Sequence, residues 1–257
     1  MRTLYWALGI IIVAMLGFFI WNSYMTPTTA QEKASQVSPV GVVPIEHATA
    51  VLRWGGTIIY TDPTDASLLA DQPEANIVLI TDIHGDHFST STLLEVVGPD
   101  TALVVPQAVA DLLPSDLAAR AQILDNGGST TIGSLQIIAI PMYNLPESAD
   151  SRHPKGRGNG YVLEQDGYRV YIAGDTAGTP EMRGLQDIDL ALVPMNLPFT
   201  MGVDEAADAV LDFKPKIVYP YHYRGQDGLA DVERFKTLVN AGDPNIEVIL
   251  AKWYPEQ

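Results

Sequence analysis

Short runs of β-branched and aromatic residues alternate along the chain with stretches whose apolar residues recur at helical spacing. "VVPIEHATAVLRW" and "TIIYTDP", which Gly55 and Gly56 separate, predict strands joined by a tight turn. "YVLEQDGYRVYIAG" predicts a hairpin that turns at Asp166 and Gly167. "STLLEVV", "DEAADAVLDF" and "DVERFKTLV" predict helices. This mixture predicts an α/β fold in which helices pack outside the sheets.

A longer apolar run stands at the N-terminus. Residues 4–21 carry no charge, and as a helix they would nearly span the hydrocarbon core of a bilayer, about 30 Å thick. Trp6 and Trp21 lie near its ends, where interfacial aromatic residues belong. We therefore predict a retained membrane anchor over residues 1–21, with the globular part extracytoplasmic. The alternative is a signal peptide cleaved near Ala30, although such peptides have a shorter apolar region of roughly 7–15 residues.

The next segment differs in composition. Residues 22–41 are rich in Thr, Ser, Ala and Pro and lack apolar periodicity, which predicts a flexible tether before a folded domain over residues 42–257. The chain has 31 acidic and 15 basic residues and a net charge of -16, which argues against a nucleic-acid partner. It contains no cysteine, so a metal would be bound through nitrogen and oxygen atoms.

Potential ligand side chains follow three apolar strands. "NIVLIT" is followed by Asp82, His84, Asp86 and His87, "YRVYIAG" by Asp175, and "KIVYPY" by His222. Proteins of the α/β class commonly build sites at such strand ends. Asp82 and His84 would share a face of an extended strand, and Gly85 would permit a turn that brings the next two side chains toward them. The alternative is a helix-capping turn that bonds local backbone.

These motifs resemble those of the metallo-β-lactamase superfamily, especially its branch of metal-dependent hydrolases with lactonase-like and phospholipase D-like enzymes. The family motif HxHxDH corresponds to "DIHGDH" (82–87), its metal-bridging aspartate to "GDT" (174–176) and its final histidine to "PYHY" (220–223). The resemblance covers the chain from about residue 42 onward. It implies a four-layer αββα sandwich.

The resemblance also implies two divalent metal ions. Asp82, His84 and His153 would hold one metal, Asp86, His87 and His222 the other, and Asp175 would bridge them. Zinc is expected first. Asp82 replaces the usual first histidine with a harder carboxylate ligand, so manganese and iron are alternatives. Asn144 lies nearest the position of another expected histidine. His153 is favoured there because imidazole binds transition metals better than a carboxamide, and an open or weak position is the alternative.

Other polar residues are expected around these ligands. His47 would bond a ligand carboxylate or the backbone, and Asp62 would support a ligand histidine or open a turn. The loop "SRHPKGRGNG" is basic, so Lys155 and Arg157, together with Asn144, are expected to bind a phosphate or carboxylate of the substrate. A mobile surface loop is the alternative.

The sequence therefore predicts a membrane-anchored metal-dependent hydrolase that uses a metal-bound hydroxide on an ester, lactone or phosphodiester bond. Asp86 and Asp175 are the expected catalytic residues, with Asp86 as general base. The expected substrate is an anionic small molecule or a lipid. One alternative is a catalytically reduced metal-binding or scaffold protein of the same fold. Another is a metal-dependent oxidoreductase.

Overall fold

The computed structural model describes residues 38–254. The predicted anchor over residues 1–21 and nearly all of the predicted tether lie outside this range. Among the described residues, no helix is long and apolar enough to cross a membrane. The first strand begins at Val40, two residues before the predicted start of the folded domain.

Six strands form the first sheet, and their order in space follows the chain. They are β1 (Val40–Glu46), β2 (Thr49–Trp54), β3 (Thr57–Thr61), β4 (Ile77–Leu79), β5 (Ala102–Val105) and β6 (Ala121–Ile123). The first three pair antiparallel, whereas β3 to β6 pair parallel. The loops that follow β3, β4 and β5 therefore lie side by side, at the carboxyl ends of these strands.

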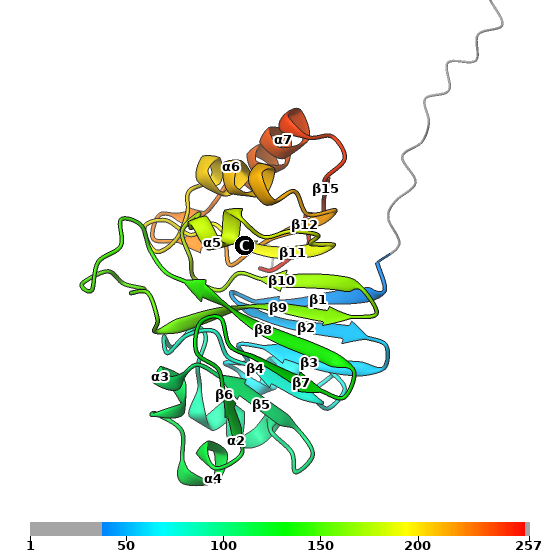
Figure 1. Cartoon of the computed structure of the whole chain (residues 1–257), viewed down its shortest axis with the longest axis vertical. Helices are drawn as coiled ribbons and strands as arrows, with labels where there is room; N and C mark the ends of the chain where they lie inside the picture. Colours follow the sequence, from blue (N-terminus) through cyan, green and yellow to red (C-terminus); the bar gives the residue numbers. More distant parts are fainter. Residues whose placement is uncertain (1–37, 255–257) are drawn as a thin grey trace, which may run out of the picture. The chain divides into compact units, whose positions relative to one another are not determined.

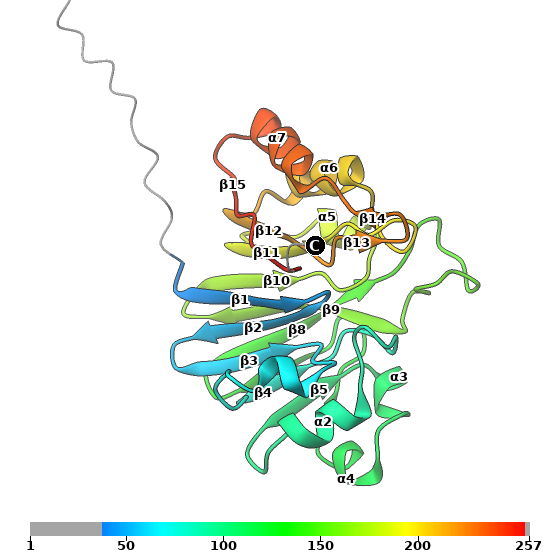
Figure 2. The ribbon, with the colours of Figure 1, turned by 180° about the vertical axis from the view of Figure 1, so that it is seen from behind.

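Seven strands form the second sheet, in the order β15-β12-β11-β10-β9-β8-β7. They are β7 (Ser129–Ile132), β8 (Leu135–Met142), β9 (Gly158–Gln165), β10 (Tyr168–Ile172), β11 (Leu190–Pro194), β12 (Ile217–Tyr221) and β15 (Glu247–Val248). Strands β10, β11, β12 and β15 are parallel. A small hairpin of β13 (Arg224–Gly225) and β14 (Gly228–Leu229) follows β12. Figure 2 shows this hairpin on the same side of the molecule as the long loop between β8 and β9.

The two sheets share an apolar core, and helices cover their outer faces. Leu52 and Ile59 of the first sheet belong to the same buried cluster as Ile137 and Tyr161 of the second. Each such side chain contributes roughly 1.5–3 kcal/mol when fully buried. Alternate residues of the first sheet point the other way, because Val51 lies in a second cluster with helix residues. This layering agrees with the expected αββα sandwich.

The helices lie on opposite sides of the strands. Figure 1 shows α6 and α7 at one end of the molecule and α2, α3 and α4 at the other, with the strands between them. The longer helices are α2 (Thr90–Val96), α6 (Val203–Phe213) and α7 (Val232–Gly242). The short ones are η1 (Ala66–Leu69), α3 (Gln107–Ala110), α4 (Ser115–Ala118) and α5 (Pro180–Arg183). The three helices predicted from apolar periodicity are confirmed, and the short ones were not predicted.

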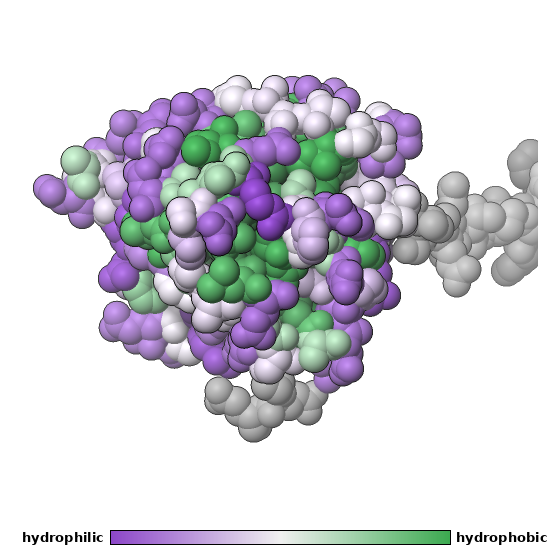
Figure 3. All heavy atoms as spheres, turned by 90° about the horizontal axis from the view of Figure 1, so that it is seen from below, coloured by the Kyte–Doolittle hydropathy of each residue, from purple (hydrophilic) through white to green (hydrophobic). Residues whose placement is uncertain are grey.

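The outer surface is of ordinary composition on the face seen from below, where hydrophobic and hydrophilic side chains are interspersed (Figure 3). Some large apolar residues are exposed, among them Leu94 and Leu112. Single exposed leucines are common on soluble domains and need no partner to explain them. The polar residues that need an explanation are buried, and they gather where the strands end.

Candidate metal centre

The loop after β4 folds as the sequence predicted. The backbone N–H groups of His87 and Phe88 donate to the carbonyl of His84 at 2.9 and 2.8 Å, which closes a tight turn. Ser89 then caps α2 by accepting a hydrogen bond from the backbone of Thr92. Asp82 Oδ2 lies 2.8 Å from His84 Nδ1, so these side chains face each other. The turn thus leaves its acidic and imidazole groups free to form a common site.

The first candidate metal group consists of Asp82, His84 and His153. His153 Nε2 lies 3.2 Å from His84 Nδ1 and 3.8 Å from Asp82 Oδ2. One potential ligand atom from each of the three lies within 4.8 Å of the others. Ligand atoms that are each about 2.0–2.2 Å from a shared metal have such spacings. Asp82 and His153 are fully buried, whereas the His84 side chain is 30% exposed.

The second candidate group consists of Asp86, His87 and His222. His222 Nε2 lies 3.3 Å from His87 Nε2 and 3.3 Å from Asp86 Oδ2. These three residues also offer ligand atoms within 4.8 Å of one another. Both histidines are buried, but the Asp86 side chain is 44% exposed. This group therefore faces solvent through its carboxylate.

Asp175, which follows β10, lies between the two groups. Its Oδ2 is 3.3 Å from His153 Nε2, and its Oδ1 is 3.4 Å from Nε2 of both His87 and His222. Oδ1 is buried and has no hydrogen-bond partner among the described residues. A buried carboxylate oxygen without a hydrogen bond is costly unless something else satisfies it. Because imidazole nitrogens surround this atom, a metal ion fits the arrangement well.

Electrostatics favour the ionised forms of Asp175 and Asp86, whereas burial raises the pKa of Asp62. Burial raises the pKa of Asp175, but the neighbouring His222 and His87 outweigh it and hold this pKa well below its usual value. For Asp86 burial acts in the same direction, and the hydrogen bond with His222 and the charge of His87 again lower the pKa overall. Burial lowers the pKa of His87, yet Asp175 and Asp62 raise it well above its usual value. Metal binding at His87 therefore competes with a proton.

Asp62, directly after β3, fixes the orientation of His87. Its Oδ2 lies 2.8 Å from His87 Nδ1 and also accepts a hydrogen bond from Thr81 Oγ1 at 2.6 Å. Its Oδ1 accepts from the backbone N–H of Thr81 at 2.7 Å. With Nδ1 engaged in this way, Nε2 of His87 is the nitrogen that faces Asp175. The structure thus places Asp62 where it supports a candidate ligand, as the sequence predicted.

Asn144 has the corresponding position beside His153. Its Oδ1 accepts from the His153 backbone N–H at 2.9 Å and lies 3.1 Å from Nδ1 of the same residue. Its Nδ2 donates to the carbonyl of Phe199 at 2.8 Å. Asn144 therefore orients His153 and does not itself point into the ligand cluster. Of the two residues considered for this position, the structure brings His153 into the group.

Lys155 and Arg157 are both paired with carboxylates of the protein. Lys155 Nζ lies 2.7 Å from Glu181 Oε1, and this hydrogen bond is the main reason that its pKa rises to about 12. Arg157 Nε and Nη2 donate to the two oxygens of Asp82 at 3.0 and 2.9 Å. The role of both residues in substrate binding stays a prediction. The pairing of Arg157 with a candidate ligand was not predicted, although a buried carboxylate in place of a histidine calls for a counter-charge.

His47, at the turn between β1 and β2, packs against the candidate ligand His222. Its Nδ1 lies 3.3 Å from the hydroxyl of Tyr254, and its ring packs edge-on against His222 with centroids 5.5 Å apart. On another side of His222, Asn196 Nδ2 lies 3.4 Å from Nδ1 of that histidine. Among the described residues the His47 side chain thus contacts Tyr254 and the candidate ligand His222, and not a ligand carboxylate or the backbone, the two partners expected from the sequence. Tyr254 and Asn196 carry no motif, so the sequence did not identify them.

Three residues of the site have left-handed backbone conformations, with φ of 47° at His47, 44° at Asp62 and 46° at His222. Residues with a side chain pay roughly 1–2 kcal/mol for this conformation. Such outliers concentrate at functional sites, where the surrounding structure holds them in place. Three residues away from the site, Asp166, Asp187 and Lys214, share this conformation, so it accompanies the site without marking it.

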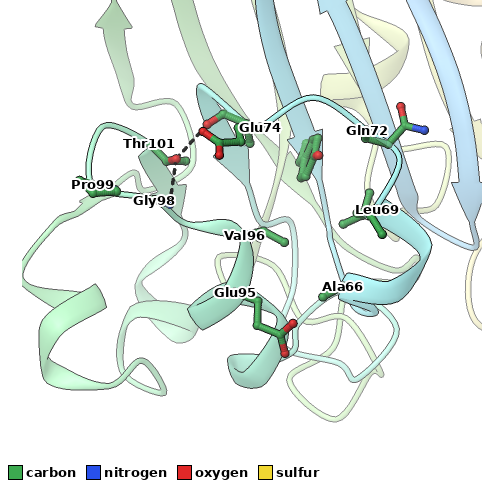
Figure 4. Close-up of a pocket in the computed structure, with 12 residues that line it drawn as sticks. Ala66, Leu69, Gln72, Glu74, Glu95, Val96, Gly98, Pro99 and Thr101 are labelled. Atoms are coloured by element: carbon green, nitrogen blue, oxygen red, sulfur yellow. Dashed lines mark hydrogen bonds between the residues drawn. The ribbon is translucent and has the colours of Figure 1, made fainter.

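Two hollows are lined by residues other than the candidate ligands. One of about 400 Å³ lies between η1 and the end of α2, and Figure 4 shows its lining, which includes Leu69, Glu74, Glu95, Val96 and Thr101. The segments that precede β4 and β5 line it, so it lies at the opposite edge of the sheet from the candidate ligands. A second hollow of about 260 Å³ is lined by Leu197, Val203 and Leu229, next to Asn196 in the chain.

Comparisons with known proteins agree with this geometry. The chain matches the beta-lactamase superfamily domain over residues 28–222, a range that contains every candidate ligand. It is 37% identical over 193 residues to a UPF0173 metal-dependent hydrolase of Thermococcus onnurineus, covering 73% of this chain and 83% of that protein. For a UPF0173 metal-dependent hydrolase of Thermococcus kodakarensis the identity is 35%, with 79% and 93% covered. A solved structure from Parabacteroides distasonis superposes with a TM-score of 0.73 at 35% identity, covering 84% of this chain and 94% of the other.

Proposed function

We propose that this chain, which belongs to the beta-lactamase superfamily and its UPF0173 metal-dependent hydrolases, cleaves an ester, lactone or phosphodiester bond at a centre of two metal ions. The membership confirms the superfamily predicted from the sequence motifs, and metal-dependent hydrolysis follows from it. The bond cleaved, the number of metals and their identity are the proposed part. Zinc is proposed first because imidazole and carboxylate ligands suit it, with manganese and iron as alternatives.

The observation that carries this proposal is the position of Asp175. Its two carboxylate oxygens face different candidate groups, one toward His153 and the other toward His87 and His222. Two bound metals would polarise the scissile bond and lower the pKa of a water molecule toward about 7. We propose the partly exposed Asp86 as the group that accepts a proton at the solvent side of the site.

Substrate binding by Lys155 and Arg157 stays a prediction, and we propose a further source of substrate attraction. Lys155 and Arg157 pair with Glu181 and Asp82, so attraction of an anionic substrate would come chiefly from the metals. If the anchor predicted over residues 1–21 holds the domain at a membrane, lipid esters and lipid phosphodiesters are also substrates to test. Each class contains a bond that the same chemistry can cleave.

The experiment compares two variants of buried aspartates in the full-length protein. Asp175→Asn removes the candidate bridge, whereas Asp189→Asn alters a buried carboxylate that pairs with Lys216 and with the backbone of Arg169. Metal content and hydrolysis of a generic phosphodiester, a lactone and an ester are measured for each. We expect about two metals per chain, and a loss of turnover on the order of 10³-fold in Asp175→Asn, since metals supply several kcal/mol. Asp189→Asn should retain both metals and turnover.

Two outcomes would contradict the proposed function. A chain that binds metal but cleaves none of the three substrate types would favour the metal-binding or scaffold alternative. Equal loss of turnover in both variants would show that any buried charge change disrupts the protein, and the bridging role would be rejected.

A further inference from the structure

We infer that Arg157 is a positioning residue that makes the two metal groups unequal. It holds Asp82 and His84 in place, and its charge offsets that of Asp82, so the group of Asp82, His84 and His153 binds metal more weakly than the group of Asp86, His87 and His222. This inference rests on the proposed metal centre and assigns Arg157 a role other than substrate binding.

The contacts of Arg157 connect it to two members of the first group. Both oxygens of Asp82 accept hydrogen bonds from its guanidinium, at 3.0 and 2.9 Å. Its Nη2 also lies 3.4 Å from His84 Nε2, the nitrogen opposite the one that faces Asp82. A planar guanidinium that binds a carboxylate through two parallel hydrogen bonds fixes its orientation as well as neutralising it.

The backbone beside Arg157 is built for this approach. Gly158 starts β9, and a Cβ at this position would lie 2.7 Å from the carbonyl oxygen of Thr81 and 3.3 Å from Asp82 Oδ1. The neighbouring Asn159 donates its backbone N–H to the same Thr81 carbonyl at 2.9 Å. Only a residue without a side chain permits this proximity. The end of the basic loop is therefore fixed directly against the segment that carries Asp82.

The burial of the two aspartates explains why the groups differ. Asp82 is fully buried, so without Arg157 its charge would be uncompensated in a low-dielectric environment, which is strongly destabilising. Asp86 is partly solvated, and its ion-pair contacts are with His87 and His222. A fixed guanidinium therefore lies beside the first group, whereas the partners of Asp86 are themselves candidate ligands. A divalent cation is attracted less strongly where a permanent positive charge is already present.

The test is a titration of the metal-free, full-length protein with Mn²⁺ and with Zn²⁺ by calorimetry, in the absence of substrate. The variants are Arg157→Ala and Arg157→Lys, and the matched control is Arg152→Ala. Arg152 belongs to the same loop but stacks on the ring of Phe199, 4.6 Å from its centroid. The melting temperature of each metal-free variant shows whether it is folded.

We expect the wild type to bind metal in two phases of different affinity. Arg157→Lys should weaken only the weaker phase, by about 10–100-fold, because it keeps the charge but loses the paired hydrogen bonds that orient Asp82. Arg157→Ala should bind metal at this phase more tightly than Arg157→Lys, because it also lacks the positive charge that opposes the cation. Arg152→Ala should behave as the wild type.

Three results would overturn the inference: two wild-type phases of equal affinity, no weakening of the weaker phase in Arg157→Lys, or a weaker phase in Arg157→Ala that is no tighter than in Arg157→Lys. If Arg157→Ala does not fold, Arg157→Lys decides, and a wild-type titration curve for it rejects the role. Because the readout is metal affinity, a chain that cleaves none of the tested substrates would still confirm or reject this inference independently of the proposed function.

Discussion

The two candidate metal groups contain the same residue types but lie in different surroundings. Each has one aspartate and two histidines, and Asp175 faces both. Asp82 is buried and bound by Arg157, whereas Asp86 is partly exposed and contacts histidines of its own group. The comparison shows that ligand identity alone does not set the charge of a metal site. The groups that surround each ligand decide how strongly it attracts a cation.

The aspartates of the two groups also differ in their exposure to solvent. Asp86 is open to solvent, so the second group borders the space through which water and substrate would enter. In the first group Asp82 and His153 are fully buried, and the loop between β8 and β9 contributes His153. We therefore expect a tight metal position at the partly exposed Asp86 next to a weaker one at the buried Asp82.

The largest effect is expected when the metals are removed in steps. With a series of chelators of increasing strength, the full-length protein should lose one metal before the other, and turnover should fall to background by the end. A bound metal stabilises the folded state by about 2.7 kcal/mol when its free concentration is a hundredfold above Kd. The melting temperature should therefore fall in two steps. Loss of both metals in one step would show that the groups act as a single site.

A smaller effect is expected from the residues that orient one histidine in each group. Asp62→Asn tolerates the left-handed backbone, but it cannot accept from the Thr81 backbone N–H and from His87 Nδ1 at the same time, because these groups bond different oxygens of Asp62. It should weaken metal binding at the second group by about 10–100-fold. Asn144→Ala should do the same at the first group, because it releases Nδ1 of His153.

Calorimetric titration of the two variants tests whether the two groups bind metal independently, since each change should move only one binding phase. If either variant alters both phases equally, the histidines of the two groups are coupled. The two groups would then not bind metal independently.

The smallest effect should follow a change behind the second group. Tyr254→Phe removes the hydroxyl that lies 3.3 Å from His47 Nδ1 and that accepts from the backbone of Arg224 at 3.3 Å. We expect the free energy of unfolding to fall by about 1 kcal/mol, as for a typical hydrogen bond. Metal affinity should change by less than roughly threefold, about 0.6 kcal/mol. Chemical denaturation and metal titration check the two expectations, and a large drop in affinity would show that His47 holds His222 in place.

Much of the fold and of the candidate site could be predicted because its signals are local. The turn at Asp166 and Gly167, the helix after Ser89 and the polar residues after β4, β10 and β12 are all visible in short stretches of sequence. Parallel strands then bring these ends together, which is why Asp175 and His222 meet. The short helices α3, α4 and α5 were missed because four residues are too few to show a helical period.

The remaining features depend on contacts between distant segments. Arg157 and Asp82 are 75 positions apart, and nothing near either residue indicates that the loop closes onto Asp82. The basic composition of that loop suggested a binding surface for an anion, but the anion it meets is part of the protein. Asn144 was likewise considered as a ligand. The hydrogen bond from the His153 backbone N–H to the side-chain amide oxygen of Asn144 is evident only in the folded loop.

The left-handed conformations at Asp62 and His222 bear on how this protein could be engineered. A glycine at either position would relax the backbone but would remove a group on which the metal centre depends. At Asp62 the same change would leave Thr81 and His87 without their hydrogen-bond acceptor, so relief of the backbone strain would be offset by unpaired buried donors. A programme to stabilise this fold should keep these two positions fixed and direct its changes to the helices on the outer faces.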